Sequence, residues 1–163
     1  AFHLVKQEQP TLELYLVGLP FVENNSSIQM WQKRGLLENV ILKGSVDHSE
    51  LIELYDQSTF MVHPSLEESF GNTLIEALAR KVPVIGGERS GAVPFLLNKG
   101  KTGHLCDVKS ISSIKDAILF LLNNPEQREL LATVAHEQVL KEFSEEIVVK
   151  KTLLLYKTIL DKE

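Results

Sequence analysis

The sequence predicts an α/β fold, in which a doubly wound parallel sheet is followed by C-terminal helices. Short apolar runs with the length of buried strands alternate with segments whose apolar residues recur at helical spacing. Strands separated by helices require right-handed crossovers, and these produce a parallel sheet covered on both faces. After the last strand only helical spacing continues. We therefore expect one domain over residues 1–163, with residues 1–107 as the sheet portion and residues 108–163 as C-terminal helices.

The expected strands and the helices between them follow in order. The strands are short runs rich in leucine, valine or isoleucine, most of them ended by glycine or proline. They are residues 11–17, 40–42, 59–62, 82–85 and 102–106. The helices show apolar residues on one face, and several start at Ser, Gly or Asn. They are residues 1–6, 26–37, 48–56, 72–81 and 91–97. The Gly86-Gly87 pair is expected to form a turn.

Three amphipathic helices are expected after residue 107. The first keeps a helical period from Ile111 to Leu122 and ends before Pro125. The second is carried by apolar residues between positions 130 and 139. The third starts at Ser144, with two acidic residues in its first turn that complement the helix dipole. Its apolar residues, which we expect to be buried, are Ile147, Val148, Leu154, Leu155 and Ile159.

The composition is that of an ordinary globular protein, with 44% apolar and 24% charged residues. A net charge of −5 argues against a nucleic-acid partner, which would require a basic excess or stripe. No run approaches the roughly 20 apolar residues that a membrane span needs. The single cysteine, Cys106, excludes an internal disulfide, and its apolar surroundings predict that it fills space in the core.

The segment from His63 to Gly87 predicts a ligand site, because a strand leads through a loop into a helix. The loop contains Gly71, and the helix start aims free backbone N–H groups and the positive end of the helix dipole at the carboxyl edge of the sheet. Anions bind at this edge in open α/β sheets. Glu68 precedes the helix, and Glu76 is expected about two turns from its start.

The two carboxylates suggest the kind of ligand. Carboxylates accept hydrogen bonds from hydroxyl groups and do not bind phosphate. Glu68 and Glu76 are therefore expected to contact hydroxyls on opposite sides of a diphosphate, which describes a nucleotide sugar. Each acid taken alone has another explanation, since acids complement helix dipoles and occupy solvated helix faces.

The segment HPSLEESFGNTLIEALARKVPVIGG, residues 63–87, resembles the signature of the group 1 (family 4) glycosyltransferases. In that family a Glu, a Gly-containing helix start and a second Glu eight places on are followed by a Pro-Val strand. Residues 40–55 resemble the family's strand, Gly-x-Val loop and Leu-Tyr helix, and residues 90–106 resemble its Gly-x-x-Pro loop and Thr-Gly strand. The resemblance implies the nucleotide-sugar-binding C-terminal half of a retaining, two-domain GT-B glycosyltransferase, with a Rossmann-like sheet.

The resemblance also implies a role for each matching position. Glu68 is the implied residue of the catalytic site, where it holds hydroxyls of the donor sugar. The residues implied to bind the rest of the donor are Phe70, Gly71, Asn72, Glu76, Gly44 and Val46. Within this set Glu76 takes the ribose hydroxyls, the backbone at the helix start takes the diphosphate, and the loop of residues 44–46 contacts the base. No metal and no organic cofactor are expected.

Family members begin this domain with a further strand, followed by an Arg and a Lys that contact the diphosphate. The sequence starts after these features, so we expect a piece of a longer protein whose first strand is missing. That strand would lie between the strands at 11–17 and 59–62, and its loss should leave unpaired strand edges. Lys43 and Arg89 are the nearest substitutes for the missing cations.

We expect a hexosyltransferase of polysaccharide biosynthesis that passes a sugar to a glycan or lipid acceptor held by the absent N-terminal domain. The chain alone is expected to be inactive. The expected location is the cytoplasm, with peripheral association of the full-length protein at the inner face of the membrane. Two alternatives remain open: an epimerase or phosphorylase of the same fold, and a non-catalytic nucleotide-sugar-binding module. His63 is expected to be a hydrogen-bonded core residue.

Overall fold

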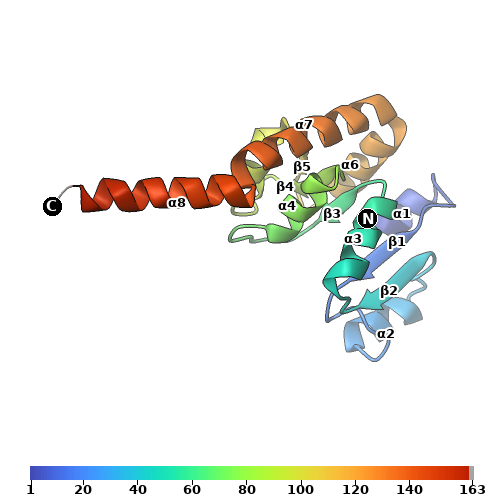
Figure 1. Ribbon diagram of the computed structural model, residues 1–163. Helices are drawn as coiled ribbons and strands as arrows, with labels where there is room; N and C mark the ends of the chain where they lie inside the picture. The colour runs from blue at the N-terminus through green and yellow to red at the C-terminus, as the bar shows by residue number, and fades with distance from the viewer. Residues whose placement is uncertain (162–163) are drawn as a thin grey trace.

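The computed structural model describes residues 1–161 and shows strands that alternate with helices before a helical C-terminal part (Figure 1). The strands are β1 (Leu14–Val17), β2 (Val40–Gly44), β3 (Met61–His63), β4 (Val84–Gly87) and β5 (His104–Cys106). The helices before β5 are α1 (Phe2–Lys6), α2 (Ser26–Lys33), α3 (His48–Gln57), α4 (Asn72–Ala79), α5 (Val93–Leu96) and the 3-10 helix η1 (Asn98–Gly100). The helices after β5 are α6 (Ile111–Asn123), α7 (Pro125–Phe143) and α8 (Glu145–Leu160). The predicted α/β class with C-terminal helices is confirmed.

The strands pair in two separate parallel sheets. One sheet is β1 with β2, and in the other β4 lies between β3 and β5. Within residues 1–161, β1 and β3 each have a single hydrogen-bonded neighbour, and they do not pair with each other. The predicted parallel pairing and the predicted unpaired edges of these two strands are therefore confirmed, whereas the single continuous sheet is not formed.

Adjacent residues of β4 face two different hydrophobic clusters. Val84 packs in one cluster with residues of α4, α5 and α7, among them Leu74, Leu96 and Ala135. Ile85 packs in the other cluster with residues of α1, α6 and α7, among them Val5, Ala117 and Leu131. Because successive residues of a strand point to opposite faces, helices cover this sheet on both faces, as predicted.

The fourth strand starts two residues later than predicted and includes the glycine pair that we expected to form a turn. The carbonyl of Pro83 accepts the N–H of Met61 at 2.8 Å, but Pro83 has no N–H of its own to donate. A Cβ on Gly86 would lie 2.5 Å from Cγ1 of Val93, and a Cβ on Gly87 would lie 1.9 Å from Oγ of Ser90. The glycines therefore allow the following loop and α5 to pack directly on the strand.

Helix α8 extends away from the rest of the molecule (Figure 1), and none of its residues is buried. The predicted burial of its apolar residues is therefore wrong. Four of them are largely exposed: Val148 47%, Leu154 65%, Leu155 57% and Ile159 57%. The spacing of these residues predicted the helix correctly, but burial also needs a surface to pack on, and in the described chain α8 adjoins the rest mainly through α7.

Among residues 1–161, no helix combines the length and the apolar character that crossing a bilayer requires.

Candidate functional site

Helix α4 starts at the carboxyl edge of the three-stranded sheet with an uncapped first turn. Gly71 is its N-cap residue, with a left-handed φ of 91° and no side-chain hydrogen bond that caps the helix. The carbonyl of Gly71 accepts the N–H groups of Leu74 and Ile75 at 3.0 and 3.2 Å. In the part of the chain that the structure describes, no group accepts the N–H of Asn72 or Thr73. These free donors lie at the positive end of the helix dipole and suit an anion.

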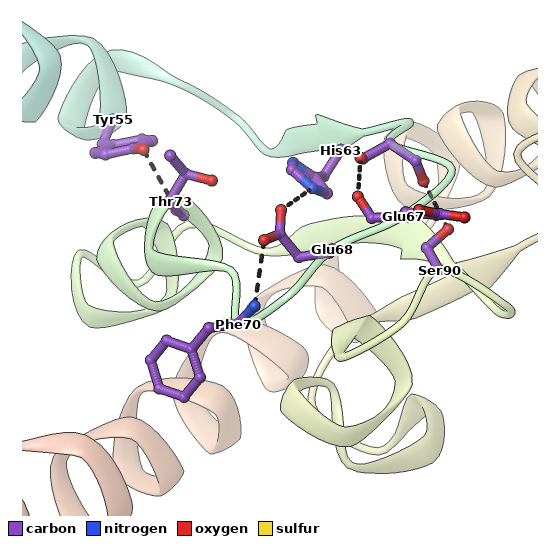
Figure 2. A network of polar contacts seen from close by, with 8 residues as sticks. Tyr55, His63, Glu67, Glu68, Phe70, Thr73 and Ser90 are labelled. Carbon is purple, nitrogen blue, oxygen red and sulfur yellow. Dashed lines mark hydrogen bonds and ion pairs between the residues drawn. The ribbon is translucent and has the colours of Figure 1, made fainter.

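Glu68 lies in the loop before α4, and its carboxylate has two internal contacts (Figure 2). Nε2 of His63 is 3.1 Å from Oε2 of Glu68, and the N–H of Phe70 donates to Oε1 at 3.3 Å. The side chains of His63 and Glu68 are only 15% and 23% exposed. Sequence reasoning expected His63 to be a hydrogen-bonded core residue and did not connect it with Glu68. The short separation of five residues between His63, at the end of the strand, and Glu68, in the following loop, was the available signal.

The loop before α4 is fixed from the side of β4. The hydroxyl of Ser90 donates to the carbonyl of Ser65 at 2.6 Å (Figure 2), and the N–H of Ala92 donates to the carbonyl of Glu68 at 2.9 Å. Gly91, between these two donors, has a φ of 54°, and a Cβ there would lie 2.2 Å from the carbonyl oxygen of Glu68. The main chain at Glu68 thus packs directly against Gly91.

Glu76 lies four residues after Asn72, the first residue of α4, and therefore little more than one turn from the helix start. The predicted distance of two turns is wrong, because the helix starts at Asn72, as expected, and only four residues separate this start from Glu76. The hydroxyl of Tyr55, on α3, is 3.4 Å from Oε2 of Glu76 and 3.3 Å from the carbonyl of Thr73. Burial and the neighbouring Glu76 charge raise the pKa of Tyr55, so the hydroxyl keeps its proton and donates it to one of the two acceptors.

The predicted base-binding loop belongs to the other sheet. Gly44 ends β2 with a φ of 62°, and a Cβ there would lie 3.1 Å from Cγ1 of Val22. Val46 is half-buried, and Asp47 caps α3 by accepting the N–H of Glu50 at 2.8 Å. The hydroxyl of Ser49 and backbone N–H groups lower the pKa of Asp47. Through α3 and Tyr55, this loop is connected to the α4 site.

The two acids, the uncapped helix start and the loop after β2 are the arrangement in which the sequence motif places a ligand. Residues 1–138 match the family model described as glycosyl transferases group 1. The chain belongs to this family. Its α/β architecture is that of the C-terminal domains of GT-B glycosyltransferases.

The sequence of the chain is similar to part of the sequence of two curated relatives. The chain is 32% identical over 133 residues to N-acetyl-alpha-D-glucosaminyl L-malate synthase of Bacillus anthracis, covering 82% of this chain and 34% of that protein. It is 28% identical over 160 residues to the capsular polysaccharide biosynthesis glycosyltransferase CapM of Staphylococcus aureus, covering 98% of this chain and 41% of that protein. The chain thus spans about a third to two fifths of the curated relatives it matches.

The fold of the chain also matches the solved structure of Anabaena Alr3699/HepE in complex with UDP, with a TM-score of 0.77 at 20% sequence identity. The match covers 98% of this chain and 44% of that chain.

The two cations expected near the candidate site, Lys43 and Arg89, differ in their surroundings. Nζ of Lys43 is 3.0 Å from Oε1 of Glu50, so this lysine is already paired. Arg89 follows β4, its side chain is 90% exposed, and its nearest acid is Glu88 at 3.4 Å. Arg89 is therefore the freer of the two cations. Across residues 1–161, no cluster of three His, Cys, Asp or Glu side chains has the arrangement of a metal site.

Cys106 is buried, as predicted. Burial and the charges of Asp107 and Glu88 raise the pKa of its thiol, which excludes a reactive thiolate at neutral pH. Cys106 borders a hollow of about 420 Å³ between β5 and α6, where the rings of His104 and Phe120 lie 5.0 Å apart. No residue of the predicted donor site lines this hollow.

Proposed function

We propose that this chain is the donor-binding domain of a retaining glycosyltransferase that uses a nucleoside-diphosphate sugar. The observation that carries the proposal is the uncapped first turn of α4 between Glu68 and Glu76. Membership of the glycosyl transferases group 1 family supports sugar transfer as the reaction. The solved structure of the HepE relative holds UDP, which supports a nucleoside diphosphate as the common part of the donor.

Each part of the donor is assigned to a different group of the site. The N–H groups of Asn72 and Thr73 donate hydrogen bonds to the diphosphate, together with the backbone of Phe70 and Gly71 at the same helix start. Glu68 then accepts hydrogen bonds from the sugar hydroxyls. On the other side of the diphosphate, Glu76 accepts from the ribose hydroxyls, and the main chain of residues 44–46 contacts the base.

The helix start also supplies what the chemical step needs. The bond between the anomeric carbon and the diphosphate oxygen breaks, and the acceptor hydroxyl oxygen bonds to the same carbon on the same face. The hydroxyl proton passes to the departing diphosphate oxygen. Negative charge grows on the departing diphosphate. Fixed N–H donors and the helix dipole stabilise this charge in the transition state. We propose no metal and no organic cofactor for this step.

The acceptor of the sugar is proposed from the relatives of the chain. The CapM relative is named for capsular polysaccharide biosynthesis, which supports a glycan as the acceptor. We propose a glycan or lipid acceptor and a hexose as the transferred group. We propose that a region outside this chain holds the acceptor, and that the whole protein works in the cytoplasm at the inner face of the membrane.

Replacing Glu76 with alanine is expected to weaken binding of the matching nucleoside diphosphate by about 1 to 3 kcal/mol, because one charged acceptor of the ribose hydroxyls is lost. The measurement is calorimetric titration of the protein with UDP and with GDP. The same substitution should leave the affinity for the 2′,3′-dideoxy form of the nucleotide nearly unchanged, because that form has no ribose hydroxyls to donate.

Glu53→Ala is the matched control, since Glu53 is an exposed acid on neighbouring α3. It is expected to bind both forms as the native protein does. Equal losses for the ribose and dideoxy forms after Glu76→Ala, or no loss at all, would contradict the assigned role.

A further inference from the structure

We propose that His63 is a positioning residue that fixes the carboxylate of Glu68 for the hydroxyl groups of the donor sugar; this rests on the proposed function. Nε2 of His63 lies 3.1 Å from Oε2 of Glu68 (Figure 2), and both side chains are mostly withdrawn from solvent. His63 itself is the last residue of β3, where it pairs in register with Gly86 of β4. The imidazole is therefore presented from a strand, which is a more rigid support than the loop that carries Glu68.

The chemistry of the pair determines which group donates. A carboxylate only accepts hydrogen bonds, through two oxygens with about four lone-pair sites in total. The imidazole must therefore hold a proton on Nε2 and donate it to Oε2. Oε1 accepts the N–H of Phe70 at 3.3 Å. About two acceptor sites of the carboxylate remain, which is enough for two neighbouring hydroxyls of a sugar ring.

Hydrogen bonds hold the main chain around Glu68, so they leave its side chain as the part of this residue that can still change orientation. Its carbonyl is held by the N–H of Ala92 at 2.9 Å, and the carbonyl of Ser65 is held by the hydroxyl of Ser90 at 2.6 Å. These bonds fix the main chain but not the three side-chain torsions of a glutamate. The contact with His63 selects one orientation of the carboxylate, so that the ordering cost is met before the sugar binds.

A positioning role predicts a specific pattern of affinities. Loss of the His63 contact should weaken the part of binding that depends on the sugar, because Glu68 contacts only the sugar. Binding of the nucleoside diphosphate alone should change little, because its groups lie at the start of α4 and at Glu76. If His63 had a purely structural role, its loss would instead weaken binding of the nucleoside diphosphate and of its sugar form by similar factors.

The experiment uses the full-length protein that contains this chain, titrated with UDP and UDP-glucose and with GDP and GDP-mannose. The quantity compared is the sugar ratio, defined as the dissociation constant of the nucleoside diphosphate divided by that of its sugar form. Glu68→Gln and His63→Leu are each expected to lower this ratio by about fivefold to fiftyfold. The double variant should fall no further than Glu68→Gln alone, because the two residues act as one unit.

Two conservative variants separate positioning from folding. The amide nitrogen of glutamine can occupy the place of Nε2, so His63→Gln should keep the sugar ratio within about twofold of the native value. The shorter His63→Asn cannot reach Glu68 and should lower the ratio as His63→Leu does. If His63→Leu no longer binds the nucleoside diphosphate, this variant has failed to fold. The comparison of His63→Gln with His63→Asn then decides whether His63 positions Glu68.

The outcomes distinguish this inference from the proposed function. A ratio that falls in Glu68→Gln but not in His63→Leu or His63→Asn overturns the positioning role and leaves the proposed function standing. A ratio that is unchanged in Glu68→Gln, or a native protein that binds neither nucleotide, overturns the proposed function and the positioning role with it.

Discussion

Replacing Gly91 with alanine is expected to destabilise the chain by about 2 to 5 kcal/mol. A left-handed conformation costs an alanine about 1 to 2 kcal/mol, and forcing a methyl group into a packed site costs about 1 to 3 kcal/mol more. At Gly91, φ is 54° and the new Cβ would lie 2.2 Å from the carbonyl oxygen of Glu68. That oxygen cannot move aside without breaking its hydrogen bond from the N–H of Ala92. Urea unfolding of the native and variant chains measures the difference.

Gly35 provides the matched control for this substitution. Its φ of 67° is also left-handed, but a Cβ there would meet no atom within 4 Å. Gly35→Ala is therefore expected to cost only the conformational part, about 1 to 2 kcal/mol. Equal destabilisation by the two substitutions would show that the contact between Gly91 and Glu68 contributes nothing. Because Glu68 would shift, Gly91→Ala should also weaken binding of the donor sugar.

Leu74→Ala is expected to destabilise the chain by about 2 to 5 kcal/mol, through the apolar surface lost and the cavity left behind. Leu74 lies in the first turn of α4 with 0% exposure and packs in the cluster that includes Leu78, Val84 and Leu96. The same helix turn carries the free N–H groups of the proposed diphosphate site. Urea unfolding measures the stability change, and we expect nucleotide affinity to fall as well if the helix start moves into the cavity.

Leu154→Ala is the matched control, because Leu154 is a helical leucine with 65% exposure on α8. Its expected effect on the free energy of unfolding is within about 0.5 kcal/mol. A loss for Leu154→Ala as large as that for Leu74→Ala would mean that α8 packs on the body of the chain and does not extend from it.

Much of the candidate site was predictable because it depends on neighbours in sequence. Gly71 with Asn72 marked a helix start, and the structure places the N-cap of α4 there. Glu68 was predicted before this start and Glu76 on the helix after it. Both are there, although Glu76 lies about one turn from the start and not two. Backbone turns and helix caps are set by a few adjacent residues, so their chemistry can be read along the chain.

Other features were not predictable because they depend on residues brought together by folding. Gly86 and Gly87 were interpreted as a turn, but the close approach of Val93 and Ser90 requires glycine within the strand. His63 was expected to be a hydrogen-bonded core residue, but only the structure identified the carboxylate of Glu68 as its partner. Sequence spacing shows that two residues are near each other in the chain but not that their side chains meet, since this depends on where the following loop returns.

The sequence by itself determined the order of strands and helices, the parallel pairing and the position of the uncapped helix start, because periodicity, glycine and proline act locally. Only the tertiary structure decided that the strands form two sheets, that α8 leaves the body, and that His63 and Gly91 hold Glu68 from two sides. The physical reason is that burial and packing are properties of pairs of surfaces, and an apolar or polar pattern describes only one surface of each pair.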